Sequence, residues 1–147
     1  MLAPETTPHV INYLINHPSI QPYVCGELAG QLDITVLLQN TDNIFFSDEV
    51  SGCGFIKLGP GRYELHSFSL PEGRGRQVKK GFEQVRDWMW SHTDCTEIVT
   101  MVPVNNRMAR GAARMTGFKK YGTLEKAWKF GGEVFDIDLY VLYKGVE

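Results

Sequence analysis

The chain has 147 residues and a mass of 16.6 kDa, which is the size of one ordinary domain. Hydrophobic residues make up 43% and charged residues 22%, which excludes a disordered tail, a collagen-like fibre and a coiled coil. The net charge is −2, no apolar run could span a membrane, and residues 1–10 lack the pattern of a secretory signal. We therefore expect a single cytoplasmic domain over residues 1–147, with neither a membrane nor a nucleic acid as partner.

The first half of the chain is predicted to be a short helix followed by an antiparallel meander. Apolar residues on one face predict a helix over residues 9–17. Polar residues at 48–52 and the sequence Gly59–Pro60–Gly61 mark two turns. β-Branched and aliphatic residues predict four strands, over residues 32–39, 43–48, 54–58 and 62–70.

The second half begins with a longer helix and a buried strand. An amphipathic helix is predicted from Arg76 onward, because four apolar residues recur with helical spacing: Val78, Phe82, Val85 and Met89. Residues 96–102 are apolar on both faces, which is typical of a central strand. The order strand, helix, strand predicts a parallel βαβ unit.

A second helix and a hairpin complete the predicted fold. Asn105 or Asn106 caps this helix and Gly117 ends it. Its inward-facing residues are predicted to be Met108, Ala109, Ala112, Ala113 and Met115. Strands over residues 118–130 and 133–144 follow, and alternation places Asp136 and Asp138 on the outer face of the last one. The predicted class is α/β, with a mixed sheet covered by helices.

Nine of the fifteen cationic residues occupy two short segments: Arg74, Arg76, Lys79, Lys80, Arg107, Arg110, Arg114, Lys119 and Lys120. This distribution suits a small polyanion bound at two helix ends, although two solvated helix faces would explain it equally well. The cysteines Cys25, Cys53 and Cys95 are widely spaced, and the histidines lack metal spacing. We therefore expect buried free cysteines and no metal site.

The turn before the longer helix has the composition of a phosphate site. Its sequence is LPEGRGRQVKK, over residues 70–80. Gly73 and Gly75 allow a ligand to approach the backbone, and Arg74 and Arg76 can form charge-assisted hydrogen bonds. The amino terminus of a helix supplies unpaired N–H groups that bind phosphate.

The segment over residues 102–122 carries a second signal, because Asn106, Ala109 and Gly117–Phe118 follow a buried strand in order. With the basic turn before it, this segment resembles the GNAT superfamily, N-acetyltransferases that move an acetyl group from acetyl-CoA to an amine. The resemblance extends over about residues 44–144. The segments HPSIQPY, ELH and PVNN look most similar to GNAT-like proteins encoded by tailed phages.

This resemblance implies a fold and a donor site. The fold is α/β, a GNAT-like mixed sheet flanked by helices and splayed between the strands that end at Leu70 and Val102. Acetyl-CoA, the acyl donor, lies in the splay, with its pantetheine along open backbone and its pyrophosphate on residues 74–79. The implied donor-binding residues are Phe68, Ser69, Leu70, Arg74, Gly75, Arg76, Gln77, Val78, Lys79 and Asn106.

The resemblance also implies direct attack by the amine, with a general base on the strand before the basic turn. Glu64 and His66 are two residues apart on that strand and share one face, so one of them is the implied base. A backbone N–H near Phe68 is the implied donor to the oxyanion. The alternative, that both side chains only cover a solvated strand face, stays open.

Three positions depart from the family pattern. Gln77 and Lys79 replace the two small residues of the pyrophosphate loop, where Lys79 either obstructs the loop or contacts phosphate. Ala113 stands where the family often has a tyrosine as general acid. Two functions therefore remain: acetylation of an amine on a protein or small molecule, or an inactive GNAT-fold module for binding or assembly, encoded by a phage. A homodimer is a further expectation.

Overall fold

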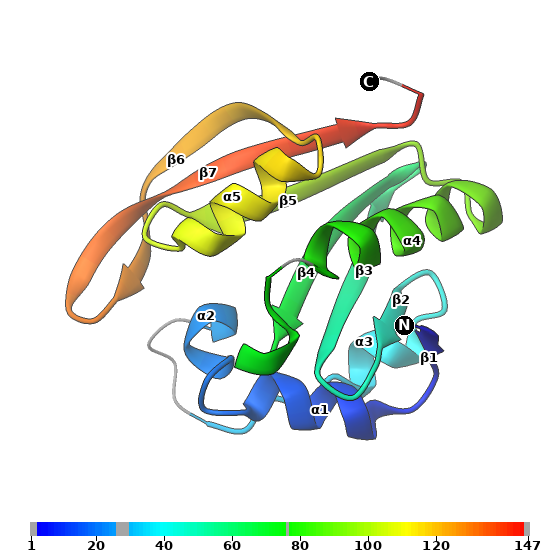
Figure 1. The fold of residues 1–147 in the computed structure, drawn as a ribbon, viewed down its shortest axis with the longest axis horizontal. Helices are drawn as coiled ribbons and strands as arrows, with labels where there is room; N and C mark the ends of the chain where they lie inside the picture. Colours follow the sequence, from blue (N-terminus) through cyan, green and yellow to red (C-terminus); the bar gives the residue numbers. More distant parts are fainter. Residues whose placement is uncertain (1–2, 26–29, 76, 146–147) are drawn as a thin grey trace.

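The structure is a computed structural model that describes residues 3–25, 30–75 and 77–145. Within these ranges, seven strands form one mixed sheet in the order β1-β2-β3-β4-β5-β7-β6 (Figure 1). Their bounds are β1 (Ala3–Glu5), β2 (Ile44–Ser47), β3 (Ser51–Gly59), β4 (Arg62–Ser69), β5 (Glu97–Pro103), β6 (Lys119–Phe130) and β7 (Glu133–Tyr143).

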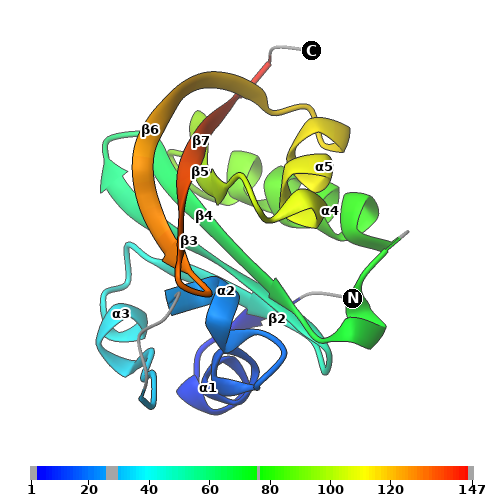
Figure 2. The same cartoon turned by 90° about the vertical axis from the view of Figure 1, so that its left-hand side faces the viewer.

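Helices cover both faces of the sheet, so the domain has three layers (Figures 1 and 2). On one face lie α1 (Pro8–Asn16), α2 (Gln21–Cys25) and α3 (Thr35–Gln39); on the other lie α4 (Gln77–His92) and α5 (Arg107–Met115), with a 3-10 turn at Pro71–Gly73. Two apolar cores result, one between the sheet and α4, the other beneath α1. This arrangement confirms the predicted α/β class and the mixed, helix-flanked sheet.

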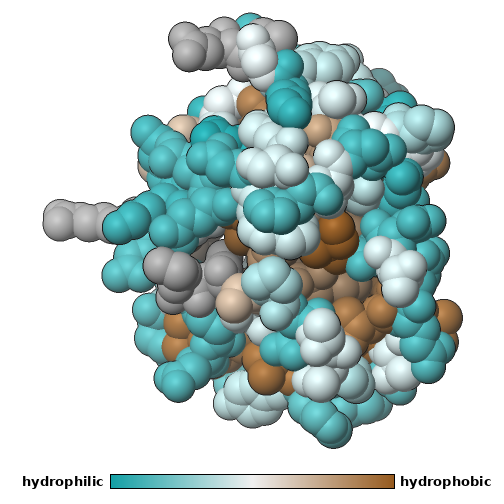
Figure 3. Space-filling model, turned by 90° about the vertical axis from the view of Figure 1, so that its right-hand side faces the viewer, coloured by the Kyte–Doolittle hydropathy of each residue, from teal (hydrophilic) through white to brown (hydrophobic). Residues whose placement is uncertain are grey.

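The surface in Figure 3 is mainly hydrophilic, and hydrophobic side chains gather in one area of that face. None of the helices formed by the described residues is both long enough and apolar enough to cross a membrane.

The parallel pairing of β4 with β5 is short. It comprises three residue pairs and ends at Glu64 opposite Val99. Beyond this pair the strands separate, and the Thr100 hydroxyl spans the start of the gap by donating to the Leu65 carbonyl at 3.1 Å. The predicted splay is therefore present, and the predicted βαβ unit of β4, α4 and β5 forms it.

The strand predicted over residues 32–39 is wrong, since Thr35–Gln39 is helix α3. The Asp33 carboxylate accepts hydrogen bonds from the Thr35 N–H at 3.0 Å and the Thr35 hydroxyl at 2.6 Å, which turns the chain at the start of the helix. These local bonds, together with the hydrogen bond that the Ile34 N–H donates to the Asn12 side chain of α1 at 2.8 Å, outweigh the strand propensity of the segment. Strand β1 has no counterpart in the prediction, because Ala3–Glu5 carries no alternating pattern.

Helix α5 has the predicted caps but a different inward face. Asn106 caps it and Gly117 ends it in a left-handed conformation, at a φ of 93°. Met108 and Met115 were predicted to face inward but are exposed, because the buried stripe runs through Ala109, Ala112 and Ala113. The methionines lie outside this stripe, on the solvent side of the helix.

The predicted outward position of Asp138 is also wrong, because this residue is 1% exposed. Its carboxylate lies 3.4 Å from the Arg110 guanidinium and 3.1 Å from the Lys120 ammonium. The Thr123 hydroxyl donates to the same carboxylate at 3.3 Å. Since two cations and a hydroxyl surround it, Asp138 can be buried where alternation alone predicts a solvated residue.

Candidate functional site

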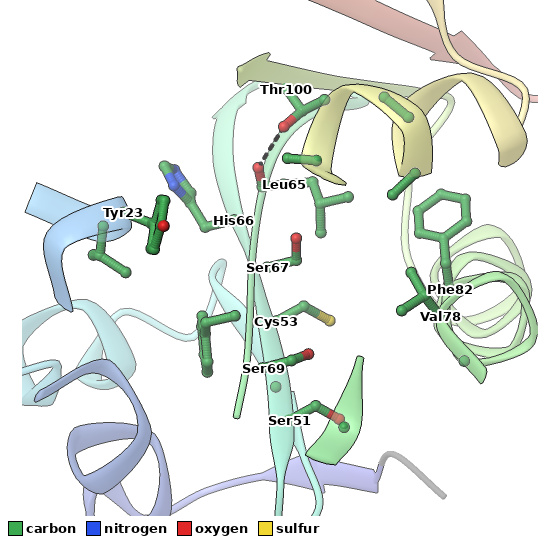
Figure 4. A pocket seen from close by; sticks show the side chains of 18 of the residues that line it. Tyr23, Ser51, Cys53, Leu65, His66, Ser67, Ser69, Val78, Phe82 and Thr100 are labelled. Carbon is green, nitrogen blue, oxygen red and sulfur yellow. Dashed lines mark hydrogen bonds between the residues drawn. The ribbon is translucent and has the colours of Figure 1, made fainter. Parts of the chain in front are cut away.

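A cavity of about 990 Å³ lies where β4 and β5 separate, and its lining residues come from both faces of the sheet (Figure 4). Neighbouring residues of a strand point to opposite faces, so β4 divides this cavity into two halves. In Figure 4, Ser67 and Ser69 point toward α4, whereas His66 points toward Tyr23 of α2. We call these parts the α4–α5 half and the α1–α3 half.

The α4–α5 half carries open strand backbone. The Leu70 N–H donates to the Val50 carbonyl at 2.8 Å, so Leu70 faces β3. Because hydrogen bonds alternate in antiparallel pairs, Phe68 also faces β3, whereas the N–H and C=O of Ser67 and Ser69 face the gap left by β5. The predicted open backbone of Phe68, Ser69 and Leu70 is thus corrected to Ser67 and Ser69. The prediction and the structure differ because the even-numbered residues of β4 are the ones that hydrogen-bond to β3.

Arg74 lines the cavity, and two backbone carbonyls hold its guanidinium. Its Nε donates to Ser69 at 3.2 Å and its Nη2 to Ser19 at 3.0 Å. Arg74 therefore joins the end of β4 to the chain between α1 and α2. Gly75 has a φ of 105°, a conformation that favours glycine, and the predicted site residue Arg76 lies outside the described residues.

The first turns of α4 present Gln77, Val78 and Lys80 to the cavity. Lys79 is not among the lining residues, and its ammonium instead lies 3.9 Å from the Glu83 carboxylate, one helical turn further on. Lys80 was missed as a site residue, although its spacing from Gln77 places both on one helix face. The position of Lys79 therefore gives no support to the idea that its side chain obstructs the pyrophosphate loop.

Helix α5 contributes its amino-terminal turn. The Asn106 Oδ1 accepts a hydrogen bond from the Ala109 N–H at 3.1 Å, and both residues line the cavity. Because the cap uses the oxygen, the amide Nδ2 of Asn106 is left to donate to a ligand. Ala113 also lines the cavity and presents no proton donor there.

In the α1–α3 half, the Glu64 Oε1 lies 2.6 Å from the His66 Nε2. The hydrogen bond from His66 lowers the pKa of Glu64 below its ordinary value, against the opposing effect of burial. His66 lines the cavity and its side chain is 54% exposed, whereas that of Glu64 is 18% exposed and lies outside the lining. The structure thus brings the predicted pair together and places the imidazole nearer the cavity.

Cys53 is the lining residue with nucleophilic sulfur. It is a buried free cysteine, and burial raises the pKa of its thiol to about 12. Cys95 is also free and buried, so the prediction is confirmed for both; the side chain of Cys25 lies outside the described residues. In the described part of the chain, no group of three or more His, Cys, Asp and Glu side chains is placed to hold a metal ion.

Comparison with known proteins identifies a family and a fold. A family model described as "Protein of unknown function (DUF2824)" matches residues 53–146, and no curated protein matches the sequence. The structure of spermidine N-acetyltransferase from Vibrio cholerae, in complex with CoA and spermine, is similar over 97% of this chain and 95% of that chain. Its TM-score is 0.79 at 16% sequence identity.

Two further acetyltransferase structures are similar over a smaller share of their length. One, from Salmonella typhimurium, modifies the N-terminal serine of the 50S ribosomal protein L7/L12; 74% of this chain and 68% of that chain are covered, with a TM-score of 0.64 and 14% identity. The other is the ribosomal-protein-S5-alanine acetyltransferase from Vibrio fischeri, at 76% and 67% coverage, a TM-score of 0.64 and 15% identity.

Proposed function

The chain belongs to the family described as "Protein of unknown function (DUF2824)" and has the fold of the GNAT acetyltransferases, and from this premise we propose that it transfers an acetyl group from acetyl-CoA to an amine. One observation carries the proposal: a single cavity has lining residues on both faces of the sheet, with open backbone and Lys80 on one side and His66, paired with Glu64, on the other. A donor and an acceptor can meet there from opposite faces.

The groups on the α4–α5 half fit acetyl-CoA chemically. The amides of a pantetheine chain need donors and acceptors, which the outward N–H and C=O of Ser67 and the N–H of Ser69 supply, while the Ser69 carbonyl binds Arg74. Phosphates need cations and N–H groups, which Lys80, the free donors of Arg74 and the first turn of α4 supply. Gly75, Gln77, Val78 and the Asn106 amide complete the proposed donor site.

Bound acetyl-CoA supplies a thioester carbonyl, at which a C–N bond would form and the C–S bond would break; the CoA thiolate would leave as a thiol by taking the second proton that the attacking nitrogen releases. The Glu64 carboxylate accepts the hydrogen bond from the His66 Nε2, which leaves the Nδ1 lone pair to take a proton from the incoming ammonium. The outward Ser67 N–H can donate to negative charge that develops on the carbonyl oxygen. Cys53 remains a neutral thiol, which favours direct attack by the amine.

A second candidate function is a GNAT-fold module that binds without turnover, and the missing proton donor at Ala113 favours it. Calorimetric titration with acetyl-CoA, followed by an assay of CoA release with a panel of amines, separates the two. Binding with amine-dependent release of CoA supports the enzyme, and binding without release supports the module. Absence of binding contradicts the proposed donor site. We also propose a cytoplasmic location, because the proposed reaction needs a supply of acetyl-CoA.

A further inference from the structure

The side chains that line the α1–α3 half of the cavity around His66 are uncharged, apart from Arg74 at its edge, whose guanidinium binds the Ser19 carbonyl between α1 and α2. The described residues that line this half come from three helices and from the sheet face beneath them: Ile15, Tyr23, Val24, Ile34, Leu37, Phe45, Ile56, His66, Phe68, Met101, Trp128 and Ile137. His66 is the only member of this set that can accept a proton to become a cation, and none of the set is acidic.

Two acidic residues do line the cavity, but they lie away from His66. Asp48 is in the turn between β2 and β3, where its carboxylate accepts hydrogen bonds from the N–H groups of Val50 and Ser51. Glu72 is in the 3-10 turn beyond the end of β4. His66 pairs with Gly54, in the interior of the β3–β4 ladder, so neither of these two carboxylates flanks it. The carboxylate beside His66 is that of Glu64, which accepts the hydrogen bond from its Nε2 and lies outside the cavity lining.

Aromatic side chains close this half on the side of the hairpin. Tyr23 of α2 and Trp128 of β6 both line the cavity, and Tyr23 stacks on Phe130 with ring centroids 5.7 Å apart. Figures 1 and 2 both show α2 beside the tip of the β6–β7 hairpin. A flat or branched apolar group is the ligand that such walls contact best.

We infer that the acceptor is a monoamine carried on an apolar body, with an aromatic body preferred, and that a polyamine is a poor substrate. This inference rests on the proposed function, because it assigns the α1–α3 half to the acceptor. The reacting ammonium loses its charge when His66 accepts its proton. A second ammonium would lose water of hydration here, and no lining carboxylate would replace it, since Glu64 accepts the hydrogen bond from His66 and lies outside the lining. Arg74 adds a positive charge to the lining, whereas an apolar body gains by burial.

The test uses matched substrates that differ only in the second charge. With acetyl-CoA saturating, CoA release is measured for hexylamine and for hexane-1,6-diamine, with 2-phenylethylamine and spermidine as further probes. We expect kcat/KM to be at least about tenfold higher for hexylamine than for the diamine, and highest for 2-phenylethylamine. Preference for the diamine or for spermidine overturns the inference and leaves the acetyltransferase proposal standing.

A pair of variants on α3 tests whether the α1–α3 half sets this preference. Leu37 lines the cavity and Val36, its neighbour, does not; the two are 42% and 76% exposed, so both accept a polar residue without core disruption. Leu37→Glu is expected to shift the ratio of kcat/KM values toward the diamine by about tenfold, since it supplies the missing carboxylate. Val36→Glu is the control and should leave the ratio unchanged; equal shifts in both variants overturn the assignment.

Binding measurements distinguish failure of the inference from failure of the proposed function. If acetyl-CoA binds and no amine is acetylated, the transfer reaction is contradicted, and calorimetry with the amines alone decides the inference. Binding of 2-phenylethylamine in preference to hexane-1,6-diamine, weakened in Leu37→Glu, supports an apolar monoamine site. Binding of neither amine, or tighter binding of the diamine, overturns it.

Discussion

The Glu64 carboxylate lies 2.6 Å from the His66 Nε2, on the strand that diverges from its parallel neighbour just past Glu64. This geometry supports a different role for each side chain in the proposed reaction. Glu64 accepts the hydrogen bond and so selects the tautomer in which Nδ1 is unprotonated, while the more exposed imidazole reaches the cavity. His66 is thus the base of the proposed reaction and Glu64 the residue that positions it.

Replacement of His66 by alanine should lower kcat by about 10²–10⁴-fold, the usual contribution of a general base. The affinity for acetyl-CoA should stay within about twofold, because His66 lies on the other half of the cavity. Steady-state kinetics and calorimetry measure the two effects. His9→Ala is the matched control, since His9 is exposed on α1 and lies outside the cavity lining. Full activity in His66→Ala would rule out its role.

The lowered pKa of Glu64 predicts how its contribution to stability varies with pH. A carboxyl group with a depressed native pKa stabilises the fold above its unfolded value, about 4.5, and loses that contribution as the pH falls through the native value. The difference in unfolding free energy between the wild type and Glu64→Gln should therefore be present at pH 7 and shrink below about pH 4.5. Urea titrations at both pH values measure it, and a difference that grows in acid would contradict the assigned direction.

Lys80 and Lys79 form a matched pair for the donor site. Lys80→Ala should weaken acetyl-CoA binding by about 1.5 kcal/mol, or about tenfold, the lower end for a hydrogen bond to a charged group. It should also reduce the salt dependence of binding. Lys79→Ala should change neither, because Lys79 pairs with Glu83 and is not a lining residue. Calorimetry at two salt concentrations checks both variants, and a larger effect for Lys79 would shift the proposed phosphate site.

Asp138 is expected to be the most sensitive charged residue for stability. Asp138→Ala leaves Arg110 and Lys120, both partly exposed, without their shared carboxylate, and loss of these charge-assisted contacts costs about 1.5–3 kcal/mol. Denaturant unfolding measures this loss. Glu125→Gln, an exposed change on β6, should cost less than about 0.5 kcal/mol. Similar values for the two variants would show that the buried pair contributes little.

Cys53 should resist modification and be dispensable for turnover. Since the pKa of its thiol is about 12, iodoacetamide at pH 8 should label Cys53 only after unfolding, as peptide mass spectrometry can show. Cys53→Ala should retain amine-dependent CoA release, because direct attack needs no acetylated cysteine. Loss of release with the fold intact, or a trapped acetyl-cysteine, would replace direct attack by a two-step transfer.

The sequence predicts the parts of the fold that depend on local pattern. The stripe from Val78 to Met89 and the Asn106 cap each lie within one element, and both predictions are confirmed. Helix α3 was missed because one of the hydrogen bonds at its start, from the Ile34 N–H to the Asn12 side chain, comes from another helix, and in the prediction the local bond to Asp33 was outweighed by the strand propensity of the segment. Asp138 was misplaced for a similar reason, since its partner Arg110 comes from another element.

For the site, the alternation of side chains along β4 is enough to predict that Glu64 and His66 lie on one face, where they contact each other. It cannot tell whether Phe68 or Ser67 turns its N–H toward the gap, because side-chain pattern does not encode the phase of hydrogen bonding in a hairpin. The choice between Lys79 and Lys80 likewise depends on how α4 is rotated against the sheet. The phage origin and the homodimer stay predictions.

The short ladder between β4 and β5 also bears on the order in which the chain folds. Strands β2, β3 and β4 are consecutive hairpins, and β6 and β7 form another, so each group pairs residues that are close in sequence. The β4–β5 ladder instead joins residues separated by the whole of α4 and must close a long loop for three residue pairs. Hairpin formation should therefore precede this closure, and the two walls of the cavity meet late in folding.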